Sequence, residues 1–395
     1  MDSSNKLFLL DAYALIYRAY YAFIKNPRIN SKGFNTSAIL GFVNTLEEVL
    51  KKENPTHIGV AFDPAGPTFR HEAFEQYKAQ REETPEAIRL SVPIIKDIIR
   101  AYHIPILEVA GYEADDVIGT LATEAGRQGI TTYMMTPDKD YGQLVSDKVF
   151  MYRPKHTGGF EVMGVEEVKA KFDIQSPAQV IDMLGLMGDS SDNIPGCPGV
   201  GEKTAQKLIS EFGSIENLLE HTDQLKGALK TKVETNREMI TFSKFLATIK
   251  IDVPIQLEMD SLVREEADED SLRSIFEELE FRTLIDRVLK KEVSGNGITS
   301  TPGSKVATGK SAPSPLPLFP EEGGGIQGDL FANFTPNEPN EAKKSNLETL
   351  GSQPHNYQLI DTENKRREII QKLLTSKILS LDTETVSYTH LRAHE

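Results

Sequence analysis

Short runs of apolar residues alternate with helix-like segments in the N-terminal part of the chain. The runs at 6–11, 57–63 and 131–138 contain few polar positions, which is typical of strands buried on both faces. Between them, 36–52 and 114–129 place apolar residues at helical spacing. Strands that alternate with helices predict an α/β fold with a parallel sheet and right-handed crossovers.

The pattern changes twice further along the chain. From residue 165 to 290 it favours short capped helices, whereas 291–356 is rich in Gly, Pro, Ser and Asn and has no periodicity. Such a composition cannot bury enough apolar surface to offset the entropy of ordering, so we expect a flexible linker. The predicted segments are a catalytic domain (1–175), a helical subdomain (176–290), the linker (291–356), the start of another domain (357–385) and an anomalous tail (386–395).

Composition narrows the function classes only slightly. No apolar run is long enough to span a bilayer, and the N-terminus lacks the basic and apolar regions of a signal peptide, so we expect a cytoplasmic protein. Cys197 is the single cysteine, which excludes internal disulfides and cysteine-based zinc sites. The net charge of −15 is unusual for a protein that binds nucleic acid, but clustered carboxylates are what divalent cations require.

Carboxylates mark the ends of the predicted strands and three motifs along the chain. Ligands of open α/β sheets bind beyond the carboxyl ends of the strands, where Asp11, Asp63 and Asp138 would converge. The motifs GYEADD, TPDKDYG and GDSSDN add more, giving nine candidates: Asp11, Asp63, Glu113, Asp115, Asp116, Asp138, Asp140, Asp189 and Asp192. Oxygen ligands without His or Cys neighbours favour two Mg²⁺ or Mn²⁺ ions, which together hydrolyse phosphodiesters.

Two other segments carry features for gripping nucleic acid. Residues 194–213 predict a helix, a glycine hairpin and a second helix, in which the amides near Gly199, Val200, Gly201, Lys203 and Thr204 cradle a phosphate with a monovalent cation such as K⁺. Residues 67–88 carry Arg70, Tyr77, Lys78 and Arg81, and a helix there would place Lys78 and Arg81 on one face beside Tyr77 as a stacking surface. The glutamates among them leave a plain solvated helix as the alternative.

These motifs, in this order over residues 1–290, resemble the 5′ nuclease domain of the flap endonuclease family, found at the N-terminus of bacterial DNA polymerase I. The resemblance implies a PIN-like fold followed by a helix–hairpin–helix subdomain. It also implies a monomer that removes primers and repairs DNA by cutting 5′ flaps, nicked or gapped duplexes and RNA primer–DNA hybrids.

The same resemblance implies roles for the site residues. It assigns the tightly held metal to Asp63, Glu113, Asp115 and Asp116 with Asp11 nearby, and the second metal to Asp138, Asp140, Asp189 and Asp192. It makes 67–88 an arch around the 5′ strand, with Lys78 and Arg81 stabilising the scissile phosphate.

Beyond residue 290 two short motifs stand out. Asp382 and Glu384 resemble the first metal-binding motif of a 3′–5′ proofreading domain, whose remaining motifs and the polymerase are expected to be missing from this chain. Within the linker, Gln327, Leu330 and Phe331 have the spacing of peptides that dock on bacterial sliding clamps.

Two alternative functions remain open at this point. A PIN-like ribonuclease would share the carboxylates, although small members of that class lack both the hairpin and the arch. A catalytically dead DNA-binding scaffold would share the hairpin, although the complete set of nine carboxylates argues against it.

Overall fold

The computed structural model describes residues 5–155, 159–289, 365 and 367. By its contacts the chain divides into the units Met1–Phe334 and Thr335–Glu395. The second unit contributes only residues 365 and 367, both helical, to the described set. The predicted linker, the tail and the two motifs that contain Gln327, Leu330, Phe331, Asp382 and Glu384 therefore lie outside the described residues.

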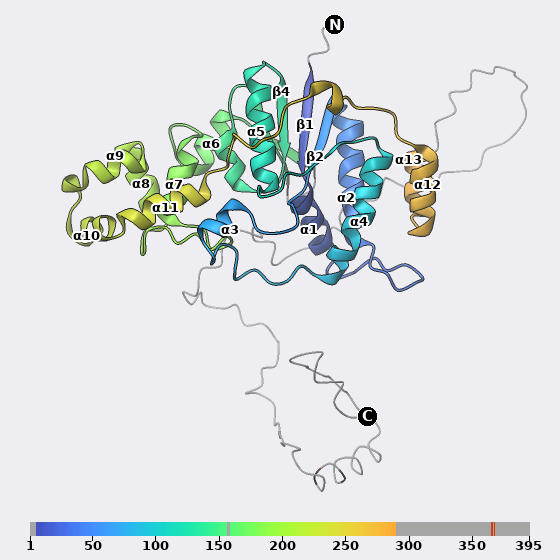
Figure 1. Cartoon of the computed structure of the whole chain (residues 1–395), viewed down its shortest axis with the longest axis horizontal. Helices are drawn as coiled ribbons and strands as arrows, with labels where there is room; N and C mark the ends of the chain where they lie inside the picture. The colour runs from blue at the N-terminus through green and yellow to red at the C-terminus, as the bar shows by residue number, and fades with distance from the viewer. Residues whose placement is uncertain (1–4, 156–158, 290–364, 366, 368–395) are drawn as a thin grey trace, which may run out of the picture. The chain divides into compact units, whose positions relative to one another are not determined.

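A six-stranded sheet in the order β3-β2-β1-β4-β5-β6 forms the centre of the first unit (Figure 1). Its strands are β1 (Lys6–Asp11), β2 (His57–Ala61), β3 (Ile106–Leu107), β4 (Thr131–Met135), β5 (Val149–Pro154) and β6 (Phe160–Met163). All neighbours are parallel except β5 and β6. The predicted α/β fold with a parallel sheet is thereby confirmed.

Helices cover both faces of this sheet, and a group of helices extends from one end (Figure 1). The sheet is covered by α1 (Ala12–Ala22), α2 (Ser37–Glu48), α4 (Glu86–Ala101), α5 (Ala114–Arg127) and α6 (Val165–Phe172), with α12 (Glu269–Glu278) and α13 (Arg282–Leu289) beyond them. The extending group, which we call the helical unit, comprises α7 (Gln179–Met187), α8 (Glu202–Phe212), α9 (Ile215–Glu220), α10 (Gly227–Thr235) and α11 (Arg237–Ala247). The short α3 (Phe69–Ala73) lies between α2 and α4 in sequence.

The core consists of two layers, one on each face of the sheet. Side chains alternate along β1, so that Leu7 and Leu9 belong to one layer and Phe8 and Leu10 to the other. The layer of Leu7 and Leu9 continues without a break from α5 into the helical unit. The helical unit therefore packs directly on the catalytic part of the chain. Among the described residues no helix is long and apolar enough to cross a membrane.

Two predicted elements are wrong in detail. The strand predicted over 131–138 ends at Met135, and Asp138 instead caps a 3-10 helix, Lys139–Leu144, by accepting the Asp140 amide. The helix predicted over 67–88 exists only as α3 and the start of α4, and the residues between form turns. Lys78 has φ 57°, which is incompatible with a right-handed helix.

Candidate metal centre

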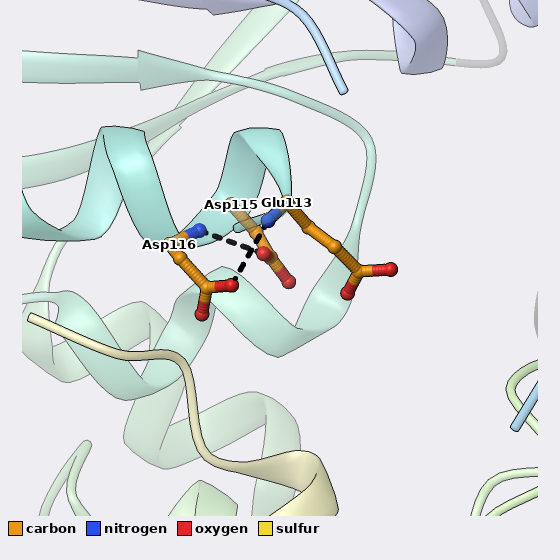
Figure 2. A group of neighbouring side chains, drawn as sticks. All are labelled: Glu113, Asp115 and Asp116. Carbon is orange, nitrogen blue, oxygen red and sulfur yellow. Dashed lines mark hydrogen bonds between the residues drawn. The ribbon is translucent and has the colours of Figure 1, made fainter. Parts of the chain in front are cut away.

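Three carboxylates gather at the N-terminus of α5 (Figure 2). One oxygen each from Glu113, Asp115 and Asp116 lies within 4.8 Å of the others. The Glu113 amide donates to Asp116 Oδ2 at 3.1 Å, and the Asp116 amide donates to Asp115 Oδ1 at 2.6 Å. The positive end of the helix dipole favours carboxylates in this first turn. The GYEADD motif therefore builds a compact acidic cluster by local geometry alone.

Arg70 holds this cluster in place through hydrogen bonds. Its guanidinium makes five hydrogen bonds of 2.8–2.9 Å: to Glu113 Oε2, to both oxygens of Asp116, and to the main-chain carbonyls of Leu246 and Thr248. These use all five of its donors, and the residue is 1% exposed. The prediction that Arg70 contacts DNA is therefore wrong, because its side chain is enclosed and fully engaged within the protein.

The three carboxylates differ in how much capacity they leave for a cation. Asp116 is fully buried and accepts four hydrogen bonds, from the Arg70 fork, the Glu113 amide and the Lys250 amide. Asp115 accepts its neighbour's amide, and its nearest Arg70 nitrogen is 3.8 Å away. Burial and the adjacent Asp116 raise the pKa of Asp115 well above its ordinary value. Asp115 is thus the better placed of these two to take a cation, and Asp116 supports it.

Asp11 and Asp63 bring the ends of the first two strands to the same site. Asp63 accepts the Ala114 amide at 2.7 Å, so the end of β2 meets the start of α5. Asp11 caps α1 through the Ala14 amide and accepts the hydroxyl of Tyr141 at 3.1 Å. Burial, and then the neighbouring Asp63, raise the pKa of Asp11 to about 7. Burial also raises the pKa of Asp63.

A second acidic group comes from two loops. Asp138 and Asp140 lie after β4, and Asp189 and Asp192 lie after α7. Burial and the charges of Asp138 and Asp189 raise the pKa of Asp140 well above its ordinary value. Lys139 forms an ion pair of 2.8 Å with Asp189. The Lys139 pairing was missed in the sequence, although the residue stands between two candidate ligands.

The donor set fits divalent cations. Asp140 Oδ1 is buried without a hydrogen-bond partner, and such an orphaned oxygen is costly unless something else satisfies it. Burial, and after it the charges of neighbouring carboxylates, raise the pKa values of Asp11, Asp138 and Asp140. Cations bound to carboxylate oxygens relieve both penalties, and hard oxygen ligands suit Mg²⁺ or Mn²⁺.

Basic residues between α3 and α4 join the two acidic groups. Lys78 Nζ lies 2.7 Å from Glu113 Oε1 and 3.7 Å from Asp192 Oδ2, and Arg81 lies 2.6 Å from Asp192 Oδ1. The Tyr77 hydroxyl donates to both acids, at 3.0 and 3.1 Å. The pKa values of Glu113 and Asp192 are lower than usual. Burial raises both, but the charge of Lys78, the largest opposing cause, outweighs it together with the other cations. Tyr77 is 3% exposed, so the prediction that it offers a stacking surface is wrong in this structure.

The glycine hairpin joins the second acidic group to α8. At Gly196, φ is 62°, and a Cβ would lie 2.3 Å from the Gly188 amide nitrogen, so only glycine fits this crossing. A Cβ at Gly201 would meet no atom within 4 Å, which leaves the backbone there open. The Thr204 amide donates to the Gly201 carbonyl and is therefore engaged within the helix. Lys203 is exposed, whereas the Val200 side chain is buried and offers only its backbone.

Models of one protein family match most of the described chain. A model for the 5′-3′ exonuclease N-terminal resolvase-like domain matches residues 6–173, and a model for the 5′-3′ exonuclease C-terminal SAM fold matches 175–270.

Curated relatives agree with these matches. DNA polymerase I of Bacillus subtilis is 43% identical over 291 residues, covering 73% of this chain and 33% of that protein. DNA polymerase I of Chloroflexus aurantiacus is 35% identical over 386 residues, covering 96% of this chain and 39% of that protein. The chain thus spans about a third of the length of the curated relatives it matches.

A solved structure of similar fold comes from bacteriophage T5. Its flap endonuclease, determined as a pseudo-enzyme-product complex with DNA and metal ions, has a TM-score of 0.51 and 21% identity. The match covers 70% of this chain and all of the phage chain. At this identity the likeness establishes a shared fold.

Proposed function

The chain belongs to the 5′-3′ exonuclease family, and on that premise we propose that it hydrolyses phosphodiester bonds at 5′ ends and 5′ flaps of DNA. The proposal is carried by one observation: Lys78 and Arg81 pair with carboxylates of both acidic groups, which brings the two groups to one site. Carboxylates would hold two Mg²⁺ or Mn²⁺ ions, and a substrate phosphate bound between the two acidic groups would lie beside Lys78 and Arg81. Two such ions supply an activated water and a stabilised leaving oxygen.

Individual ligands follow from the hydrogen bonds that each carboxylate leaves open. We assign the first cation to Asp63, Asp115 and Glu113, with Asp11 close by and Asp116 as their support. We assign the second cation to Asp138, Asp140, Asp189 and Asp192, among which Asp140 has the unpaired oxygen. Lys78, Lys139 and Arg81 form ion pairs with Glu113, Asp189 and Asp192.

The hairpin is proposed to grip the duplex part of the substrate. The open backbone at Gly201 and the exposed Lys203 favour contact with a phosphate, optionally through K⁺. Lys232 of α10 adds a positive side chain beside the hairpin, because its Nζ lies 3.3 Å from the Gly199 carbonyl. Phosphate contacts of this type carry no sequence preference, which suits an enzyme that recognises DNA structure.

The remaining proposals concern partners and place of action. Bacterial relatives named DNA polymerase I favour repair and removal of RNA primers in the cytoplasm, by a monomer. A sliding clamp remains a proposed partner for the motif of Gln327, Leu330 and Phe331. A peptide carrying Leu330→Ala and Phe331→Ala should lose clamp binding that the natural peptide shows.

The experiment uses a 5′-flap duplex labelled at the flap, incubated with the chain in Mg²⁺ or in EDTA. We expect cleavage near the flap junction that requires Mg²⁺ and is lost in Asp115→Asn and Asp140→Asn. Glu166→Gln is the matched control, because Glu166 is 78% exposed on α6 and pairs with Lys169. Binding without cleavage would favour the inactive scaffold, and cleavage of RNA alone would favour a ribonuclease.

A further inference from the structure

Residues 246–253, the last two residues of α11 and the six that follow it, form a segment that we call the strap. Three parts of the metal centre bind it through hydrogen bonds to its main chain. Arg70, which holds Glu113 and Asp116, donates to the carbonyls of Leu246 and Thr248 at 2.9 Å each. The same guanidinium therefore fixes the first acidic group and the beginning of the strap.

Gln143 makes the corresponding link from the second acidic group. Its side-chain nitrogen donates to the carbonyls of Asp140 and Ala247, both at 3.0 Å. Its side-chain oxygen accepts the Ile249 amide at 2.8 Å. One side chain thus spans from the main chain of a proposed metal ligand to two positions of the strap.

The helix α5 completes the attachment. Asp116 Oδ1 accepts the Lys250 amide at 2.8 Å, and Thr120 Oγ1 accepts the Val253 amide at 3.2 Å. A Cβ at Gly119 would lie 2.7 Å from the Ile249 side chain, so a glycine there permits the close approach of strap and helix. The strap is consequently seated on the catalytic part along its whole length.

The N-terminal end of the strap belongs to α11, the helix that supports the hairpin. Ser243 of α11 is fully buried, and its hydroxyl accepts the Gly196 amide at 2.9 Å. Ser243 and Thr248 are separated by less than about two helical turns, and the chain between them is helical up to Ala247. The link from the hairpin to the strap is therefore short. Movement of the hairpin relative to the carboxylates would therefore have to break the hydrogen bonds of the strap.

We propose that the strap sets the distance between the duplex-gripping hairpin and the metal-holding carboxylates, and thereby selects which phosphodiester bond is cut. Gln143 and Thr120 are positioning residues in this scheme. Successive phosphates of one strand are offset by about 3.4 Å along the duplex axis, so a shift of this size along the axis carries the neighbouring bond toward the site. The inference rests on the proposed function, since it needs a nuclease that anchors its substrate at the hairpin.

The test measures cleavage position at single-nucleotide resolution on the 5′-flap duplex. The variants are Gln143→Leu, which removes its contacts with Ala247 and Ile249 with little change of volume, and Thr120→Val, which removes its contacts with Lys250 and Val253. Arg237→Met is the matched control, because Arg237 bonds the Leu219 carbonyl at the opposite end of α11. Rate constants, KM and the Mg²⁺ concentration for half activity are recorded for each, with circular dichroism to confirm folding.

We expect the ratio of neighbouring to principal product to rise at least about fivefold in Gln143→Leu, since each of the two lost strap hydrogen bonds represents a factor of about five. Thr120→Val should shift the ratio in the same direction, and Arg237→Met should leave it unchanged. Altered rate or Mg²⁺ dependence with an unchanged product ratio in both variants would overturn the strap inference and leave the nuclease intact. A wild-type chain that does not cut the flap would instead remove the proposed function itself.

Discussion

Replacing Arg70 by methionine tests whether this side chain is structural, as its burial indicates. The substitution removes one of the two cations that pair with Glu113 and both guanidinium bonds to Asp116, while the side chain keeps a similar length. Breaking a buried ion pair by removing one partner costs about 3–5 kcal/mol. A domain with a total stability of about 5–15 kcal/mol would lose a large part of it.

Arg81→Met is the matched comparison, since Arg81 also pairs with a carboxylate of the centre. Its side chain is 42% exposed, compared with 1% for Arg70. Partly exposed pairs contribute about 0–1 kcal/mol because water screens them. Urea unfolding of both variants in EDTA should therefore show a much lower midpoint for Arg70→Met than for Arg81→Met.

The reasoning also predicts how DNA binding responds to salt. A side chain that neutralises a phosphate contributes about one unit to the slope of log affinity against log salt. Because Arg70 is enclosed, Arg70→Lys should leave that slope unchanged in EDTA, whereas Lys203→Met should reduce it. A reduced slope for Arg70→Lys, together with an unchanged unfolding midpoint for Arg70→Met, would refute the structural role.

Three further outcomes follow from the site. Mg²⁺ should raise the melting temperature, measured by scanning fluorimetry, more at pH 8 than at pH 6, and equal shifts at both pH values would contradict this. Burial, and then Asp63 and Asp138, raise the pKa of Asp11 to about 7. The stability that protonated Asp11 contributes is therefore present at low pH and lost as pH rises through 7, where a bound cation would offset the charge. Gly196→Ala should destabilise the fold by about 1–3 kcal/mol or more through its clash with Gly188, whereas Gly201→Ala should melt like the wild type and weaken only DNA binding. Lys78→Met should bind Mn²⁺ more tightly without DNA, as measured by calorimetry, and cut more slowly; weaker Mn²⁺ binding would oppose this.

Local patterns were sufficient for the parts of the fold that depend on neighbouring residues. The apolar runs at 6–11 and 57–63 are strands, and 114–129 forms α5 with Val117 and Leu121 buried. Gly129 follows this helix with φ 80°, as a terminating glycine should. Asp138 was predicted to end a strand, whereas it caps a 3-10 helix. The residues after Met135 are compatible with either structure, so the sequence pattern alone does not distinguish them.

Long-range partners explain the errors at the site. Arg70 was expected on the surface because it belongs to a charged segment, yet its main-chain acceptors are 176 and 178 residues away in sequence. Gln143 carries no local signal, since its contacts with the strap are also more than 100 residues distant. Tyr77 was predicted to stack on a base because it is aromatic and lies in a charged segment. Its burial depends instead on how the turns of 74–81 fold over the carboxylates.

The contacts of Lys78 indicate that the basic segment can serve two purposes. The Lys78 ammonium lies 2.7 Å from Glu113 Oε1 and 3.7 Å from Asp192 Oδ2, so it neutralises one acid from each of the two acidic groups. Binding of cations would release Lys78 from both carboxylates, and the nearest remaining anion would then be a substrate phosphate. Since Lys78 sits at a positive φ in a turn rather than within a helix, its release requires no helical hydrogen bonds to break. We therefore expect cation binding and substrate capture to be linked through this one side chain.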